Sequence, residues 1–281
     1  MTTVVPGRGL RRRLQSAVDA LDLPSGPGDP SPVTDADLAP LPPPAQRWLR
    51  RAGVVGQSRT WSFRVQFQGR FRLGADKPWL RAEAWQYSTA LVPARAYVMR
   101  LDLGPVPMFG LDTYARGRGR MVGRMLGVVK VADGAGPELD LGELTTYLND
   151  AVMLAPSSLL VPAVTWGAVD DTSFDVAITD AGLTSTGRVR LDDDDRPCDF
   201  VTDDRFADTP GGLVRAPWST PHTEWVGRDG RRFPDGGRAV WHLADGELEY
   251  ARGAFLPETF AADLPPARAA AALRPAVGAR R

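Results

Sequence analysis

The chain has 281 residues, and its 34 Lys+Arg are balanced by 34 Asp+Glu, so the formal net charge is zero. This balance excludes a strongly basic nucleic-acid binder and an acidic disordered chain. A hydrophobic content of 43% with eight Trp is enough for a real core, and the single Cys198 excludes a disulfide framework and a multi-cysteine metal site. We therefore expect a soluble globular protein without a metal or a cofactor.

The first 40 residues are expected to form a flexible extension and a proline-rich linker. Leu10, Leu14 and Val18 recur at helical spacing beside arginines. Residues 8–21 could therefore form a basic helix that lies on an anionic membrane. Because the apolar positions are so few, we expect a loosely ordered segment instead. Eight prolines between positions 24 and 44 keep the next stretch extended. Because no apolar stretch follows the first charged residues, we expect no signal peptide and a cytoplasmic location.

The clearest strand pattern covers residues 61–68, where Trp61, Phe63, Val65 and Phe67 alternate with polar residues. Similar patterns predict strands at 79–88, 94–102, 172–179, 183–191, 198–206, 238–243 and 247–255. Short connectors such as Asp245-Gly246 predict hairpins between them.

Helices are predicted at 45–52 and around residues 142–155. In the second, Leu144, Leu148, Val152 and Ala155 form one apolar stripe, and Glu143 lies in the expected first turn. Strands with one apolar face need cover on that face only. The sequence therefore predicts an α+β fold: a mainly antiparallel curved sheet or half-barrel closed by one or more helices. Its single folded domain would cover 41–256, followed by a disordered tail at 257–281.

Charge is unevenly distributed along the chain. Residues 1–140 hold 20 Lys+Arg against 12 Asp+Glu, and residues 141–281 hold 14 against 22. The two halves either neutralise each other within one domain or leave a basic face for an anionic ligand or a membrane.

Residues 116–127 combine four arginines with four glycines. Val122 stands where a dinucleotide fingerprint needs its third glycine, and no Walker motif is present. We expect a flexible loop here, with an anion site that includes Arg116 as the alternative.

Polar residues at buried positions are the remaining site candidates. Asn149 and Asp150 lie on the long helix beside its apolar stripe, so they either face a cavity or lie at the surface. If residues 198–206 form a strand with Phe206 inward, Asp204 also points inward, and a buried carboxylate must be paired or protonated. Asp204 is then either functional or part of a structural ion pair, with Arg205 beside it.

Several segments together resemble a bacterial family of uncharacterised proteins. They are residues 41–49, 85–87, 111–114, 142–150, 153–156, Trp166, 201–206 and 217–221. The resemblance covers residues 41–256, and its more specific signatures are the Asn149-Asp150 helix and the Asp203-Asp204-Arg205 segment. Its strand order distantly resembles the half-barrel carriers of outer-membrane lipoproteins, which is an analogy of fold.

Three functions remain open on these observations. The first is binding of an apolar or amphiphilic small molecule in a half-barrel cavity. Its predicted ligand contacts are Trp61, Phe63, Trp85 and Tyr87 as the wall, Asn149, Asp150 and Asp204 as polar anchors, and Arg205 and Arg116 for an anion. The second is a structural or partner-binding module without chemistry. The third is an enzyme with Asp150 or Asp204 as acid or base.

Overall fold

The computed structural model describes residues 8–209, 211–228 and 231–271. Its helices are α1 (Arg8–Ala20), α2 (Asp35–Leu38), α3 (Pro43–Arg51) and α4 (Pro137–Leu154), with short 3-10 helices η1 (Pro156–Leu159) and η2 (Pro266–Arg268). Its strands are β1 (Ser62–Phe71), β2 (Leu80–Thr89), β3 (Ala94–Leu103), β4 (Val106–Ala115), β5 (Arg118–Met125), β6 (Val129–Ala135), β7 (Val164–Asp170), β8 (Ser173–Asp180), β9 (Leu183–Leu191), β10 (Pro197–Thr202), β11 (Phe206–Thr209), β12 (Gly212–Arg215), β13 (Trp218–Ser219), β14 (His222–Arg228), β15 (Arg231–Leu243) and β16 (Gly246–Ala262). None of the described helices is long and apolar enough to cross a bilayer.

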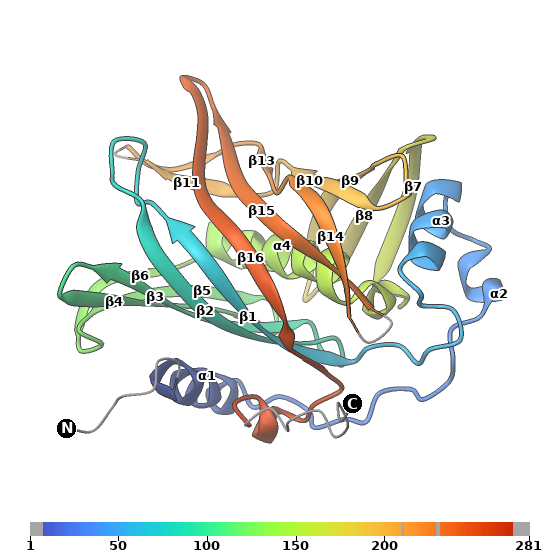
Figure 1. Cartoon of the computed structure of the whole chain (residues 1–281), viewed down its shortest axis with the longest axis horizontal. Helices are drawn as coiled ribbons and strands as arrows, with labels where there is room; N and C mark the ends of the chain where they lie inside the picture. The colour runs from blue at the N-terminus through green and yellow to red at the C-terminus, as the bar shows by residue number, and fades with distance from the viewer. Residues whose placement is uncertain (1–7, 210, 229–230, 272–281) are drawn as a thin grey trace, which may run out of the picture.

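One antiparallel sheet of fourteen strands dominates the fold. Its order is β6-β5-β4-β3-β2-β1-β16-β15-β13-β10-β9-β8-β7, and β14 pairs with β15 beside this path. Helix α4 links β6 to β7 and lies inside the curve of the sheet (Figure 1). The predicted α+β fold, a mainly antiparallel half-barrel closed by a helix, is confirmed.

The main core lies between α4 and the concave face of the sheet. Leu144, Leu148 and Val152 of α4 are at most 1% exposed, and they share one buried cluster with Phe174 of β8 and Trp218 of β13. The apolar stripe predicted for the long helix therefore faces the sheet, as its spacing requires. The helix begins earlier than predicted, at Pro137, so Glu143 lies in its middle and not in its first turn.

The convex face carries a second layer that the predicted domain boundaries leave out. Leu10, Leu14 and Val18 of α1 are at most 3% exposed and pack with Trp85 and Tyr87 of β2. The prediction of a flexible extension is therefore wrong for residues 8–20. Their apolar positions are few, but an apolar strip on the sheet covers them, and sequence periodicity cannot reveal that cover.

The predicted linker and tail are also more ordered than expected. Val33 and Leu38 are at most 1% exposed, and Val33 forms a β-bridge with Val55. Strand β16 continues to Ala262, and Ala269 is fully buried after η2. The prediction of disorder is therefore wrong for residues 257–271, and the rest of that predicted tail lies outside the described residues.

Bulges and glycines give the sheet its curvature. The register shifts between Arg64 and Gln66, where β1 pairs β16, and again where β15 pairs β16. Gly69 and Gly253 face each other across β1 and β16, where backbones approach so closely that a Cβ on either residue would clash with the opposite strand. Bulges and glycines at such positions increase the twist and permit a tight coil.

Candidate functional site

Buried charges on α4 meet a buried arginine of β3. The Arg95 Nε atom lies 2.7 Å from Asp150 Oδ2, and its Nη1 atom lies 3.2 Å from Glu143 Oε2. All three side chains are 6% exposed. Gln86 of β2 adds a hydrogen bond from its amide to Asp150 Oδ2 at 2.8 Å. Glu143 and Asp150 are seven residues apart, which places them on the same face of the helix.

Acidic side chains outnumber arginines in this cluster. Burial, reinforced by the neighbouring Asp112 carboxyl, raises the pKa of Glu143 to about 7, although Arg95 opposes this shift. Burial also raises the pKa of Asp112 and of Asp150, against the effect of Arg95. Arg205 favours the charged form of all three acids. Three carboxyl groups thus face two guanidinium groups, and burial favours the protonated form of the acids.

Asp204 and Arg205 point in different directions. The Arg205 guanidinium lies 4.4 Å from the ring centroid of Trp218, on the side of the acidic cluster. Asp204 instead accepts a hydrogen bond from the Thr186 backbone N–H at 2.8 Å and pairs with the exposed Arg215 at 2.6 Å. Strand β10 ends at Thr202, so the alternation that predicted an inward Asp204 does not apply.

Asn149 and Asp150 anchor α4 to opposite parts of the sheet. Both residues are at most 4% exposed. Asn149 Oδ1 accepts a hydrogen bond from the Thr220 hydroxyl at 2.7 Å, after β13, while Asp150 is held by β2 and β3. The polar pair is thus satisfied within the protein and acts as a tether, so neither expected setting, an open cavity or the surface, describes it.

The four predicted wall residues do not form one wall. Phe63 faces the concave side, where it packs with Met153 of α4. Trp85 and Tyr87 face the convex side, beneath α1, and Trp61 lies against the backbone at residues 26 and 28. The antiparallel register explains the error. Phe63 pairs with Ser88, so the odd-numbered residues of β2 lie on the opposite face of the sheet.

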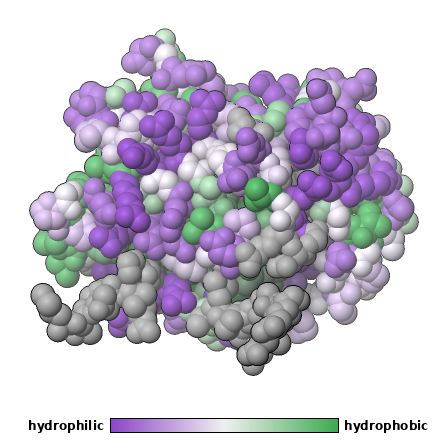
Figure 2. All heavy atoms as spheres, in the orientation of Figure 1, coloured by the Kyte–Doolittle hydropathy of each residue, from purple (hydrophilic) through white to green (hydrophobic). Residues whose placement is uncertain are grey.

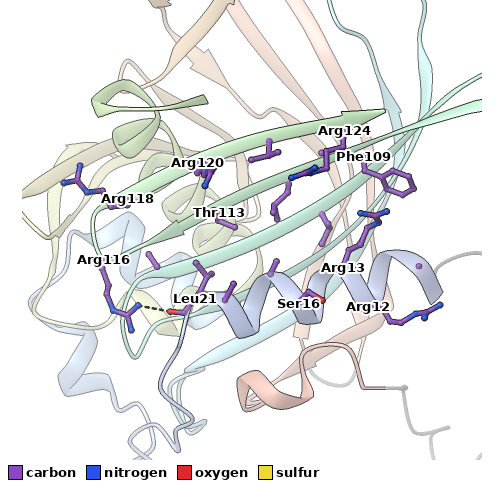
Figure 3. A pocket seen from close by; sticks show the side chains of 18 residues that line it. Arg12, Arg13, Ser16, Leu21, Phe109, Thr113, Arg116, Arg118, Arg120 and Arg124 are labelled. Atoms are coloured by element: carbon purple, nitrogen blue, oxygen red, sulfur yellow. Dashed lines mark hydrogen bonds between the residues drawn. The ribbon is translucent and has the colours of Figure 1, made fainter. Parts of the chain in front are cut away.

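A groove of about 930 Å³ lies on the convex face, between α1 and strands β4 and β5 (Figure 3). Its floor is apolar. Val98, Leu111 and Val122 form one row across β3, β4 and β5, and Phe109 and Ala115 extend this floor along β4. Helix α1 packs mainly on β2 and β3, and the neighbouring apolar strip on β4 and β5 lines the open groove.

Arginines surround this floor. They come from α1 (Arg12 and Arg13), from the turn after β4 (Arg116) and from β5 (Arg118, Arg120 and Arg124). We call the hollow and these six residues the arginine groove. In Figure 3, Arg13, Arg124 and Phe109 gather at one end and Arg116 and Arg118 at the other.

Only two of the six arginines form ion pairs among the described residues. Arg118 pairs with Asp140 at 3.1 Å and Arg120 with Asp133 at 3.0 Å. Arg116 donates to the backbone carbonyls of residues 21 and 22, and the Arg13 guanidinium lies 4.2 Å from the Phe109 ring centroid. The groove therefore keeps an excess of positive charge above an apolar floor, which suits an anion with an apolar part.

The glycine-rich segment after Arg116 forms a strand and not the flexible loop that was predicted. Residues 118–125 form strand β5, so the predicted flexible loop is wrong. Gly119 faces α4, where a Cβ would clash with the Leu139 carbonyl, and its N–H donates to Asp140 Oδ1 at 2.7 Å. Gly119 thus permits close packing of the helix, and the neighbouring Arg118 and Arg120 project to the opposite face.

Sequence reasoning missed Arg95 and Asp112, the pairing of Glu143, and the apolar groove floor on β4. The arginines of residues 116–127, considered as an alternative anion site, line the groove. The signal for the groove was present: arginines recur with a period of two at 118 and 120, with Val122 and Arg124 continuing the same face. Among the described residues, no three His, Cys, Asp or Glu side chains gather in a way that could hold a metal ion.

Comparison with known proteins places the chain among uncharacterised relatives. Residues 31–253 match the profile described as a family of unknown function (DUF6544), and no curated protein matches. The predicted resemblance to such a family is therefore confirmed.

Several solved structures are similar to the chain at low sequence identity. A putative outer membrane lipoprotein-sorting protein domain from Vibrio parahaemolyticus is 10% identical, with a TM-score of 0.43, over 78% of this chain and 90% of that one. A DUF1329 family protein from Desulfovibrio piger is 12% identical (TM-score 0.39; 84% and 94%), and a LolA superfamily protein from Nitrosomonas europaea is 12% identical (TM-score 0.37; 75% and 91%). The distant similarity to lipoprotein-carrier folds expected from the strand order is found, and it concerns the fold alone.

Proposed function

The chain belongs to the family of unknown function DUF6544, and from that premise we propose that it binds an anionic amphiphile. The ligand would be a molecule with an apolar chain or ring system and a negatively charged head group. Its site would be the arginine groove on the convex face. The observation that carries the proposal is the combination of an apolar floor with arginines on both sides of it.

The size and the chemistry of the groove support this ligand class. Its volume of about 930 Å³ lies in the range of pockets that enclose a small molecule. Each methylene removed from water on the floor stabilises the complex by roughly 0.8 kcal/mol. Arg12 and Arg124 have no carboxylate within 4 Å among the described residues. Arg124 donates one hydrogen bond, to the Val128 carbonyl, so both arginines keep donors for a head group.

The interior of the half-barrel is a poorer site for the same ligand. The apolar stripe of α4 packs on the concave face there, and Leu144 and Leu148 are fully buried. Asn149 accepts a hydrogen bond from Thr220, and Asp150 accepts hydrogen bonds from Gln86 and Arg95. These contacts support a structural role for the polar pair and leave no free acid or base at Asp150.

The test is displacement of a fluorescent fatty acid from the purified full chain by oleate, with oleyl alcohol as the uncharged counterpart. We expect oleate to bind and the alcohol to bind at least tenfold more weakly. The double variant Arg12→Gln/Arg124→Gln should lose roughly 5-fold in affinity per arginine, because a charge-assisted hydrogen bond contributes about 1.5–3 kcal/mol and solvent exposure reduces this to about 1 kcal/mol.

Two further variants locate the binding site. Thr113→Trp fills the groove from β4 and should abolish binding, whereas Arg51→Gln removes an exposed arginine on α3, away from the groove, and should change nothing. Binding that survives both Thr113→Trp and the double arginine variant, or equal affinity for oleate and the alcohol, would overturn the proposal.

A further inference from the structure

The turn between β5 and β6 exposes an unusual amount of apolar surface. Of the ten exposed large hydrophobic residues in the described part of the chain, five lie within residues 121–131. Leu126 is 58% exposed and Val128 is 70% exposed, at the turn itself. Val129 and Val131 on β6 are 58% and 53% exposed. We call residues 126–131 the apolar turn. Figure 2 shows hydrophobic residues gathered at the end of the molecule where β4 and β6 lie (left).

The backbone of the turn is also in an unfavourable conformation at Leu126. Leu126 and Gly127 have φ values of 53° and 76°, both in the left-handed region. Asn, Asp and Gly adopt that region at low cost, whereas a leucine there is strained and also exposes its side chain to water. Neither feature helps the isolated protein, so the leucine is better explained by a partner that buries it.

Positive charge surrounds the apolar turn. The Arg13 guanidinium of α1 lies directly over Gly127, and Arg124 donates to the Val128 carbonyl at 3.3 Å. Lys130 lies within the turn and shares Asp133 with Arg120. Arg12, also exposed, lies beside Arg13 on α1. Apolar side chains ringed by basic ones match the interface of an anionic bilayer, where the apolar groups enter the headgroup boundary and the basic groups remain among the phosphates.

We propose that the chain docks on anionic lipid bilayers through the apolar turn, with Leu126 and Val128 inserted and Arg12, Arg13 and Arg124 on the lipid headgroups. The other partner to consider is a second copy paired along the edge strand β6. That pairing would bring Lys130 of the two copies close together, and a lysine on an edge strand disfavours such pairing. This docking surface shares Arg12, Arg13 and Arg124 with the arginine groove, but its inserted residues lie outside the groove, and it does not require that the groove bind a ligand.

The test is cosedimentation of the full chain with vesicles of phosphatidylcholine alone, or with about one third phosphatidylglycerol. We expect binding to the anionic vesicles only, weakened as salt is raised. Leu126→Asn and Val128→Asn should each reduce partitioning about tenfold, since each removes an inserted apolar side chain. Asn suits the left-handed region, so Leu126→Asn keeps the turn. Leu73→Asn changes a residue of similar exposure, 54%, in another turn and should leave partitioning unchanged.

Other outcomes would refute the docking surface. They are equal binding to neutral and anionic vesicles, no binding to either, or full binding by Leu126→Asn. A lipid-free dimer that Leu126→Asn dissociates in sedimentation velocity would assign the turn to a second copy and overturn the proposal. The oleate assay separates the two proposals, because Leu126→Asn should leave oleate affinity intact while Thr113→Trp should leave vesicle binding intact.

Discussion

Replacing Arg95 with methionine tests whether the charged cluster on α4 is a structural element. Arg95 provides the cationic partner of both Asp150 and Glu143, and its guanidinium also lies 4.7 Å from the Tyr97 ring centroid. Methionine retains an unbranched apolar side chain and removes the charge. The two carboxyl groups, each 6% exposed, then remain in the protein interior without their guanidinium partner.

The expected loss of unfolding free energy depends on how each carboxyl group is stabilised once Arg95 is removed. Breaking a buried ion pair by removing one partner costs about 3–5 kcal/mol. Asp150 retains the Gln86 amide, and Glu143 takes up a proton readily because burial already raises its pKa to about 7. We therefore expect the lower end, about 3 kcal/mol of unfolding free energy, at pH 8.

The cost should fall as the pH is lowered. Loss of Arg95 raises the pKa of both carboxyl groups in the folded state further above their unfolded values. A folded-state pKa that is raised contributes stability at low pH, which is lost as the pH rises through that pKa. The variant should therefore recover part of the lost stability between pH 8 and pH 5.5.

Urea unfolding followed by tryptophan fluorescence measures the loss of unfolding free energy at pH 8 and at pH 5.5. The triple variant Arg95→Met/Asp150→Asn/Glu143→Gln removes the two carboxylates that Arg95 contacts directly and should regain at least half of the loss at pH 8. A loss below about 1 kcal/mol for Arg95→Met at pH 8, or an equal loss at both pH values, would refute the structural interpretation.

Three further predictions concern single residues in the second half of the chain. Burial lowers the pKa of His222 to about 4 from 6.5, so this residue should contribute a loss of about 3 kcal/mol of unfolding free energy as the pH falls from 6.5 to 4, and urea titrations of His222→Leu at the two pH values should show a loss smaller by that amount. Asp204→Ala should cost about 1–2 kcal/mol in the same assay, through the unpaired Thr186 N–H, and a loss above 3 kcal/mol would show that this carboxylate is a buried ion partner instead. Gly187→Ala should cost roughly 1–3 kcal/mol of unfolding free energy, because its Cβ would overlap the buried Phe200 ring, and an unchanged urea midpoint would refute that packing.

The strands and the long helix could be predicted from local patterns alone. The alternation at 61–68 and the stripe from Leu144 to Ala155 depend only on residues near in sequence, because a strand repeats every two residues and a helix every 3.6. The same patterns require cover on one face of the sheet, which led to the half-barrel. The arginine-rich segment 116–127 was misjudged because its glycines resemble a loop, although residues 118–125 form a strand in which Gly119 faces α4.

The positions of the sites depended on contacts between distant segments. Trp85 and Phe63 lie on opposite faces because of a strand register that no local pattern specifies. The arginine groove exists because α1 covers β2 and β3 and leaves β4 and β5 open, and Arg95 is a buried charge only because α4 lies across it. Periodicity determines which residues share a face, because backbone geometry is local. Tertiary packing determines which face is covered and which charges meet, because burial depends on segments far apart in the chain.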